Sequence, residues 1–136
     1  FIFMSEQTLV FIKPDGVKRG LVGEVLSRFE RKGLVLNECR HMMMTSELSD
    51  AHYAEHIERP FYPGLKEFIL SGPIVVMVLE GERAISVVRT MIGSTDSAEA
   101  APGTIRGDLS LSKGENIIHA SDSPESAKRE IANFFG

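Results

Sequence analysis

The longest apolar stretch of the chain is Ile74-Val75-Val76-Met77-Val78-Leu79. An unbroken apolar run after a Gly72-Pro73 turn predicts a strand that is buried on both faces and therefore lies in the middle of a sheet. Shorter runs predict three further strands, at residues 8–12, 34–44 and 117–119. Polar residues inside 34–44 indicate that this strand is half exposed.

Between the strands, apolar residues recur at the spacing of an amphipathic helix. The expected helices cover residues 21–29, 45–57, 65–70, 84–92 and 124–135. Gly33 is a plausible helix end, and Thr45 or Ser46 is a candidate N-cap. Ser123 is the expected N-cap of the last helix, because Pro124 suits its first position.

The order of these elements is β-α-β-α-β-α-β-α. Four strands with helices to cover one face suggest an α+β ferredoxin-like sandwich with a four-stranded antiparallel sheet. A parallel doubly wound sheet is the competing arrangement, and periodicity alone does not separate the two. Residues 93–115 have little hydrophobic periodicity, and a loop of that length inside a compact domain is usually functional or disordered.

Composition bounds the class of protein. The 136 residues fit one domain, with 43% hydrophobic and 25% charged residues, as is ordinary for a globular chain. The net charge of −4 argues against general binding to nucleic acid or anionic membranes. Cys39 is the only cysteine, so no internal disulfide forms, and we expect a reduced, cytoplasmic setting. Met4 is a candidate natural start.

The most informative residue is His119, in the run Asn116-Ile117-Ile118-His119-Ala120-Ser121-Asp122. Histidine is seldom placed inside an apolar strand unless it is a ligand, a switch or a reactive group. A neutral imidazole is nucleophilic near pH 7, because the unperturbed pKa of imidazole is about 6.5. This window alone leaves a structural and a reactive histidine equally open.

Other residues outside the regular core are compatible with a phosphate ligand. Lys13, Arg59, Arg89 and Arg106 carry suitable charges, although any one of them taken alone is more often solvated or paired with an acid. Tyr53 and His56 are further candidates, expected on one helix face. Phe61 and Leu65 could form an apolar clamp for a flat ring. Glu130 is a candidate carboxylate partner for His119. The chain has no P-loop, Gly-x-Gly-x-x-Gly, Gly-x-Ser-x-Gly or paired Cys/His metal motif.

Several separated windows together resemble the nucleoside diphosphate kinase family. The resemblance extends from residue 6 to residue 135 in the order and spacing of that family. The windows are Phe11-Ile12-Lys13-Pro14-Asp15-Gly16-Val17, Tyr53-Ala54-Glu55-His56, Arg59-Pro60-Phe61-Tyr62, Ser71-Gly72-Pro73, Pro102-Gly103-Thr104-Ile105-Arg106-Gly107-Asp108 and Asn116-Ile117-Ile118-His119-Ala120-Ser121-Asp122-Ser123.

The resemblance implies a ferredoxin-like fold and a ping-pong reaction. A nucleoside triphosphate would give its γ-phosphate to His119, and a nucleoside diphosphate would then take it from the phosphohistidine. Recognition of the base by stacking implies broad tolerance of base and sugar. Mg²⁺ would arrive on the nucleotide phosphates, without a dedicated protein site. The family also implies a homo-oligomer, a hexamer before a tetramer. Given the net charge, we expect no membrane or nucleic-acid partner.

The resemblance also assigns roles to individual residues. The implied phosphate-binding residues are Lys13, Arg89, Arg106 and Thr95, with Tyr53 and His56 close by; Asn116 would contact the sugar and the phosphate end, Phe61 would stack on the base beside Leu65, and Glu130 and Ser121 would orient His119. Lys13 and Tyr53 are also counted with the catalytic group.

Three departures from the family pattern bear on rate, base preference and assembly. They are Ala120 in place of the usual glycine, Lys113 in place of an apolar residue and Ser97 in place of a frequent proline. Two rival functions stay open at this point. One is a non-catalytic module that uses the nucleotide as a ligand, and the other is a ferredoxin-like domain that binds nucleic acid.

Overall fold

The computed structural model describes residues 5–136, so the candidate start Met4 lies outside it. Its centre is a four-stranded sheet in the order β2-β3-β1-β4, and all three strand pairings are antiparallel. This order confirms the ferredoxin-like sandwich and excludes the parallel doubly wound sheet. The strands are β1 (Ser5–Ile12), β2 (Val35–Met42), β3 (Ile74–Glu82) and β4 (Ile118–Ala120).

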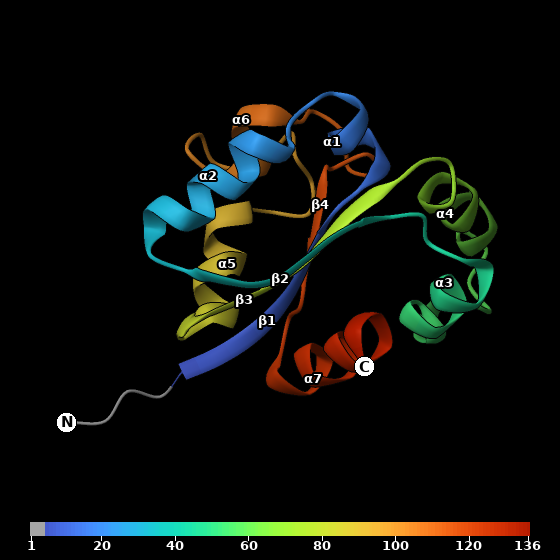
Figure 1. Ribbon diagram of the computed structural model, residues 1–136. Helices are drawn as coiled ribbons and strands as arrows, with labels where there is room; N and C mark the ends of the chain where they lie inside the picture. Colours follow the sequence, from blue (N-terminus) through green and yellow to red (C-terminus); the bar gives the residue numbers. More distant parts are fainter. Residues whose placement is uncertain (1–4) are drawn as a thin grey trace.

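Helices pack on both faces of the sheet, which corrects the expectation that one face alone is covered (Figure 1). Side chains of β1 alternate between the two cores, with Val10 and Ile12 in one and Leu9 and Phe11 in the other. The helices are α1 (Pro14–Lys18), α2 (Val22–Lys32), α3 (Ser46–His52), α4 (Tyr62–Ile69), α5 (Ala84–Ile92), α6 (Ile105–Leu109) and α7 (Pro124–Phe135). The first core lies against α2 and α5, and the second lies against α3, α4 and α7.

The predicted central strand and the predicted caps are confirmed. Residues 74–79 of β3 are each at most 4% exposed, and β3 pairs with a strand on either side. Gly33 ends α2 with a φ of 106°, a left-handed conformation that costs glycine little. The Thr45 and Ser123 side chains accept bonds from the backbone N–H of Leu48 and Ser126 at the starts of α3 and α7.

Several boundaries differ from the prediction. The expected helix over residues 45–57 ends at His52, and a 3₁₀ turn (Ala54–His56) follows Tyr53. The loop over residues 93–115 contains α6, and α1 was not predicted. The last strand begins at Ile118 instead of residue 117, because Ile117 has a φ of 75° that no regular strand adopts. Residues 35–41 of β2 are exposed throughout, because β2 is an edge strand of the sheet.

Within residues 5–136, no helix combines the length and the apolar content that a membrane span requires.

Candidate functional site

His119 is presented by the short edge strand β4. It lies opposite Phe11 of β1, and the two rings stack with their centroids 4.8 Å apart and an interplanar angle of 26°. The chain enters β4 through Ile117, whose positive φ is strained for a β-branched residue. The Asp15 carboxylate accepts a bond from the Ile117 N–H, and the Ile117 carbonyl accepts one from Lys13, so both peptide groups are held in place.

Glu130 holds one side of the His119 ring. The carboxylate comes from the middle of α7 and is 4% exposed, with Oε1 2.9 Å from the Nε2 of His119. The Ser121 hydroxyl, which is buried, donates to the same oxygen at 2.8 Å. Because an ionised carboxylate only accepts, Nε2 carries the proton and Nδ1 is left with its lone pair. The geometry therefore selects one tautomer of His119.

The charge of Glu130 is retained despite its burial. Burial alone would raise the pKa of this carboxyl, but the bonds from His119 and Ser121 outweigh it and lower the pKa overall. A carboxylate held in this way supports positive charge on the imidazole that it contacts.

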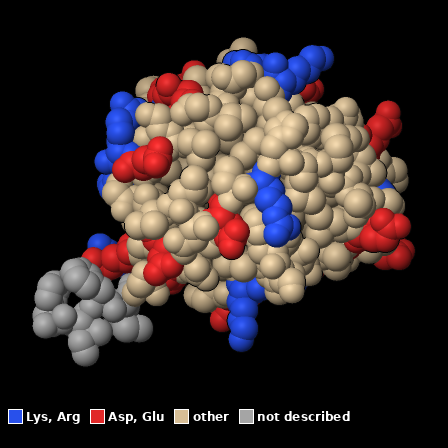
Figure 2. Space-filling model, viewed as in Figure 1, with Lys and Arg blue, Asp and Glu red and all other residues tan. Residues whose placement is uncertain are grey.

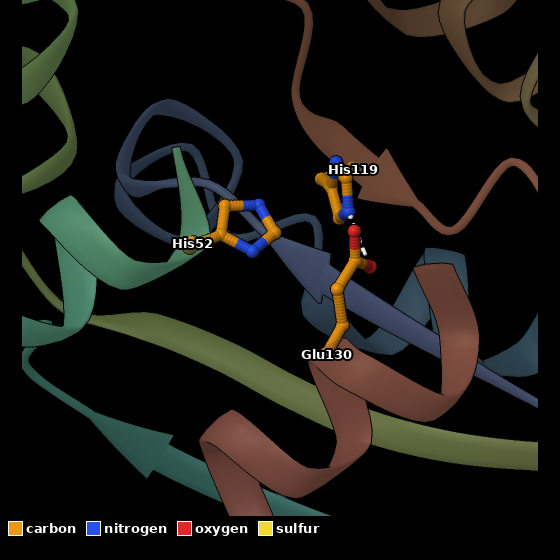
Figure 3. Close-up of side chains that lie close together, drawn as sticks. All are labelled: His52, His119 and Glu130. Carbon is orange, nitrogen blue, oxygen red and sulfur yellow. Dashed lines mark hydrogen bonds and ion pairs between the residues drawn. The ribbon is translucent and has the colours of Figure 1, made fainter. Parts of the chain in front are cut away.

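His52 is part of this cluster, although the sequence reasoning passed over it. Its ring, at the end of α3, meets the His119 ring edge to face, and the ring centroids are 4.6 Å apart. Figure 3 shows the two rings beside Glu130. Its Nδ1 is buried and has no hydrogen-bond partner within residues 5–136. Burial, together with the nearby His119, lowers the pKa of His52 to about 3. The ring is neutral at physiological pH.

Lys13 and Asn116 meet at the start of β4. The Lys13 Nζ donates to the Asn116 Oδ1 at 2.7 Å, and the Asn116 amide donates to the Thr95 carbonyl at 3.0 Å. Burial, with the positive charge of Arg106, lowers the pKa of Lys13 to about 8. The structure thus links Lys13, Asn116 and Thr95, three predicted nucleotide-binding residues, by consecutive hydrogen bonds. The side chain of Thr95 is exposed.

Two arginines bind the backbone around His119. The Arg106 guanidinium donates to the carbonyls of Gly93, Asn116 and Ile118, and Arg89 donates to the carbonyl of Ala120. Burial, followed by the charge of Arg89, lowers the pKa of Arg106 to about 10. The Arg106 guanidinium stays positive at neutral pH, so it contributes a positive field at the histidine strand.

A pocket of about 240 Å³ opens beside the His119 ring. Its walls come from α3 and the 3₁₀ turn, from α5, from β4 with the following loop, and from α7. The lining residues are His52, Tyr53, Glu55, His56, Arg89, His119, Ala120, Asp122, Ser126, Arg129 and Glu130. Tyr53 and His56 share this pocket even though the expected common helix face is interrupted.

Aromatic rings continue from the pocket to the surface. The ring centroids of Tyr53 and His56 lie 6.4 Å apart, and those of His56 and Phe61 lie 5.4 Å apart. Phe61 is 55% exposed just before α4, and Leu65 follows one turn later, with its N–H bonded to the Phe61 carbonyl. Phe61 offers an uncovered ring face near the pocket, whereas Arg59 of the preceding turn is simply exposed.

The sequence motifs thus name most of the residues that the structure brings together. The sequence assigned no role to His52 and Phe11, which contact the His119 ring, or to Asp122 and Arg129 in the pocket wall. The local sequence does not show that His52 is buried, and Phe11 reaches His119 only through the pairing of β1 with β4.

Comparisons with known proteins agree on one family. The family model described as "Nucleoside diphosphate kinase" matches residues 6–136. The nucleoside diphosphate kinase of Archaeoglobus fulgidus is 58% identical over 130 residues, covering 96% of this chain and 86% of that protein. The one from Staphylothermus marinus is 60% identical over 131 residues, with 96% and 93% covered. A solved halophilic nucleoside diphosphate kinase from Halobacterium salinarum, in complex with CDP, has a TM-score of 0.94 at 48% identity and covers 97% of this chain and 88% of its own.

Proposed function

The chain belongs to the nucleoside diphosphate kinase family, and we propose that it transfers the γ-phosphate of a nucleoside triphosphate to a nucleoside diphosphate through a phosphohistidine at His119. The observation that carries this proposal is the bond from His119 Nε2 to the buried Glu130 carboxylate. That bond leaves the Nδ1 lone pair free as the attacking atom, beside a pocket that reaches the surface.

In the first step, the Nδ1 lone pair forms a bond to the γ-phosphorus. The bond from that phosphorus to the bridging oxygen breaks, and its electron pair leaves on the nucleoside diphosphate. The ring becomes cationic as it is phosphorylated, because Nε2 keeps its proton. The Glu130 carboxylate balances this charge, and Ser121 fixes the carboxylate from the other side.

In the second step, a different nucleoside diphosphate enters the same pocket and its terminal oxygen attacks the phosphohistidine. The N–P bond breaks and its electron pair returns to Nδ1. Because the rings leading outward are aromatic and the Phe61 face is exposed, we infer that the base stacks on Phe61 beside Leu65. Stacking does not read base edges, which supports broad tolerance of purines, pyrimidines and both sugars.

Beyond the nucleophile, the site promotes phosphoryl transfer mainly by neutralising the charge of the phosphates, since this reaction depends on positioning and electrostatics. We assign phosphate contacts to Lys13, Arg89, Arg106 and the Thr95 side chain, with Tyr53 and His56 at the pocket wall. We assign Asn116 to the sugar and the phosphate end, with its amide oriented by Lys13 and by the Thr95 carbonyl. Lys13 is largely protonated at pH 7, because its pKa is about 8.

Mg²⁺ would be shared with the nucleotide phosphates. Asp122 and Glu55 line the pocket and offer carboxylate oxygens, the ligands that this ion prefers alongside phosphate and water. When bound, the ion would neutralise charge on the transferred phosphoryl group. The two acids would orient the ion that the nucleotide brings, without forming a dedicated protein cage.

The active form is proposed to be a homo-oligomer, a hexamer before a tetramer. Support comes from the edge strand β2, whose Val35 and Leu36 are 58% and 37% exposed. An edge strand with exposed apolar side chains can pair with a second copy of itself. A cytoplasmic location stays a prediction.

The rival functions separate in one set of assays. A nucleotide-binding module would not transfer phosphate, and a nucleic-acid binder would bind single-stranded RNA with steep salt dependence. On the face in Figure 2, basic and acidic groups are interspersed and no basic stripe is visible, which favours neither rival.

Steady-state transfer from ATP to a second diphosphate tests the proposal. We expect parallel double-reciprocal lines for the native chain and loss of activity in His119→Ala. Intersecting lines, or a normal rate in His119→Ala, would refute the covalent route.

A further inference from the structure

We propose that His52, His119 and Glu130 form a binding site for a transition-metal ion of the zinc type, and that the bound ion blocks phosphorylation of His119. Zinc binding follows from the geometry of the three side chains. The block on phosphorylation rests on the function proposed above. The site is distinct in chemistry from Mg²⁺ that arrives with the nucleotide.

The three residues converge from three separate elements, α3, β4 and α7 (Figure 3). One ligand atom from each lies within 4.8 Å of the others, and His119 Nε2 is already 2.9 Å from Glu130 Oε1. A tetrahedral ion with bonds of about 2.1 Å places its ligands roughly 3.4 Å apart. The widest pair therefore has to close by about 1.4 Å at most, which small side-chain rotations can supply.

The burial of the ligands points to a built site. His52 and Glu130 are 7% and 4% exposed, and the Nδ1 of His52 has no partner within residues 5–136. An unpartnered imidazole nitrogen in a protein interior costs free energy that a bound ion would recover. The ring also has little freedom to lose, because it packs between Phe11, Tyr53 and Phe134.

The ligand set selects the metal. Two imidazoles and one carboxylate bind zinc in many open sites, with a water in the fourth position. Here the pocket that these residues line would hold that water. Mg²⁺ prefers an octahedral set of oxygen ligands and dehydrates reluctantly, so it competes poorly for two nitrogens.

Occupancy would silence His119 through Nε2, the ring nitrogen that faces Glu130. An ion on Nε2 displaces the proton bonded to Glu130, which forces the remaining ring proton onto Nδ1 and removes the attacking lone pair. Glu130 then binds the ion and no longer supports positive charge on the ring.

Arg129 opposes the metal. Its guanidinium lies 3.7 Å from the free oxygen of Glu130, so its charge disfavours a cation on that carboxylate. Removing this arginine should therefore tighten zinc binding without adding a ligand. An increase in affinity of this kind cannot result from a loss of folding.

The test is calorimetric titration of the nucleotide-free chain with ZnCl₂, with circular dichroism on every variant. The ligand variants are His119→Ala and His52→Phe, which keeps an aromatic ring in the interior. The matched control is His41→Ala, an exposed histidine on β2. We expect one ion per chain, a loss of at least about tenfold in each ligand variant and less than twofold in the control. Arg129→Ala should bind severalfold tighter, and millimolar Mg²⁺ should not displace zinc.

The inhibitory part is tested by mixing zinc-loaded protein with Mg-ATP and measuring the phosphorylated fraction by mass. We expect no phosphorylation until a zinc-selective chelator is added. Phosphorylation at the full rate with zinc bound would overturn the block, whereas failure to phosphorylate with chelator present from the start would contradict the proposed function instead. The proposed site would be overturned if titration with ZnCl₂ released or absorbed no heat of binding. It would also be overturned if His41→Ala lost as much zinc affinity as the ligand variants.

Discussion

Replacing Glu130 with glutamine removes one charge from the site and leaves its shape. The amide oxygen of Glu130→Gln can take the place of Oε1, where it accepts from His119 Nε2 and from the Ser121 hydroxyl. The selected tautomer is therefore preserved. What is lost is the negative charge that balances the imidazole ring while it is being phosphorylated.

The size of the effect follows from the bond between His119 Nε2 and Oε1, because this is the bond that strengthens as the ring becomes cationic. Hydrogen bonds to a charged group contribute about 1.5–3 kcal/mol, against about 0.5–1.5 kcal/mol between neutral groups. Because Glu130 is 4% exposed, water does not replace the missing charge. We expect a loss of about 1.4 kcal/mol in the transition state, which is roughly tenfold in the rate of phosphorylation.

The assay is a single-turnover quenched-flow measurement of phosphoenzyme formation at saturating Mg-ATP. Ser121→Ala is the companion variant, because it removes only a neutral donor to the same oxygen and should slow the step less than Glu130→Gln. Chemical denaturation verifies that each variant is folded. A folded Glu130→Gln enzyme that is phosphorylated within twofold of the native rate would refute the charge-balancing role.

Three further predictions follow from individual residues. Because the pKa of Lys13 is about 8, binding of ADP should weaken about tenfold or more between pH 7 and pH 9.5. Lys13→Arg stays charged, so its ADP affinity should change much less with pH. The same pH dependence of affinity in both proteins, measured by titration calorimetry, would contradict this. The pKa of His52 is about 3 in the folded chain and about 6.5 when unfolded, so the unfolded chain takes up the proton first and stability falls as the pH drops below 6.5. Between pH 7 and pH 4.5, the free energy of unfolding measured with urea should fall by about 2.5 kcal/mol less in His52→Phe than in the native chain. The same pH dependence of this free energy in both proteins would show that His52 is not held neutral. Phe61→Ala should weaken ADP and CDP alike by about 1–3 kcal/mol, with Phe61→Leu intermediate, and a loss confined to one base would rule out simple stacking.

The fold was predictable where the local pattern is strong. Residues 74–79 and 84–92 carry unambiguous strand and helix periodicity, and Ser123 with Pro124 marks a helix start. The helix over residues 45–57 was overextended, because its polar sequence has no apolar rhythm to show where it ends. The choice between antiparallel and parallel sheets depends on contacts far apart in sequence, and the family resemblance supplied it.

The site was predictable in its motif residues and unpredictable in its packing. A histidine at position 52 has the same local pattern whether it faces water or the interior. Its burial depends on α3 packing against α7, more than seventy residues later. Ile117 reads as a strand residue, and its unusual φ depends on Asp15 and Lys13, about one hundred positions earlier. Neither long-range contact leaves a local signal.

The most direct test of the account is the intact mass of the chain after brief incubation with Mg-ATP and no acceptor. A phosphohistidine at His119 predicts an acid-labile gain of one phosphoryl group, roughly 80 Da, that is absent in His119→Ala and disappears when a diphosphate is added. No gain in the native chain, or the same gain in His119→Ala, would contradict a phosphohistidine at His119.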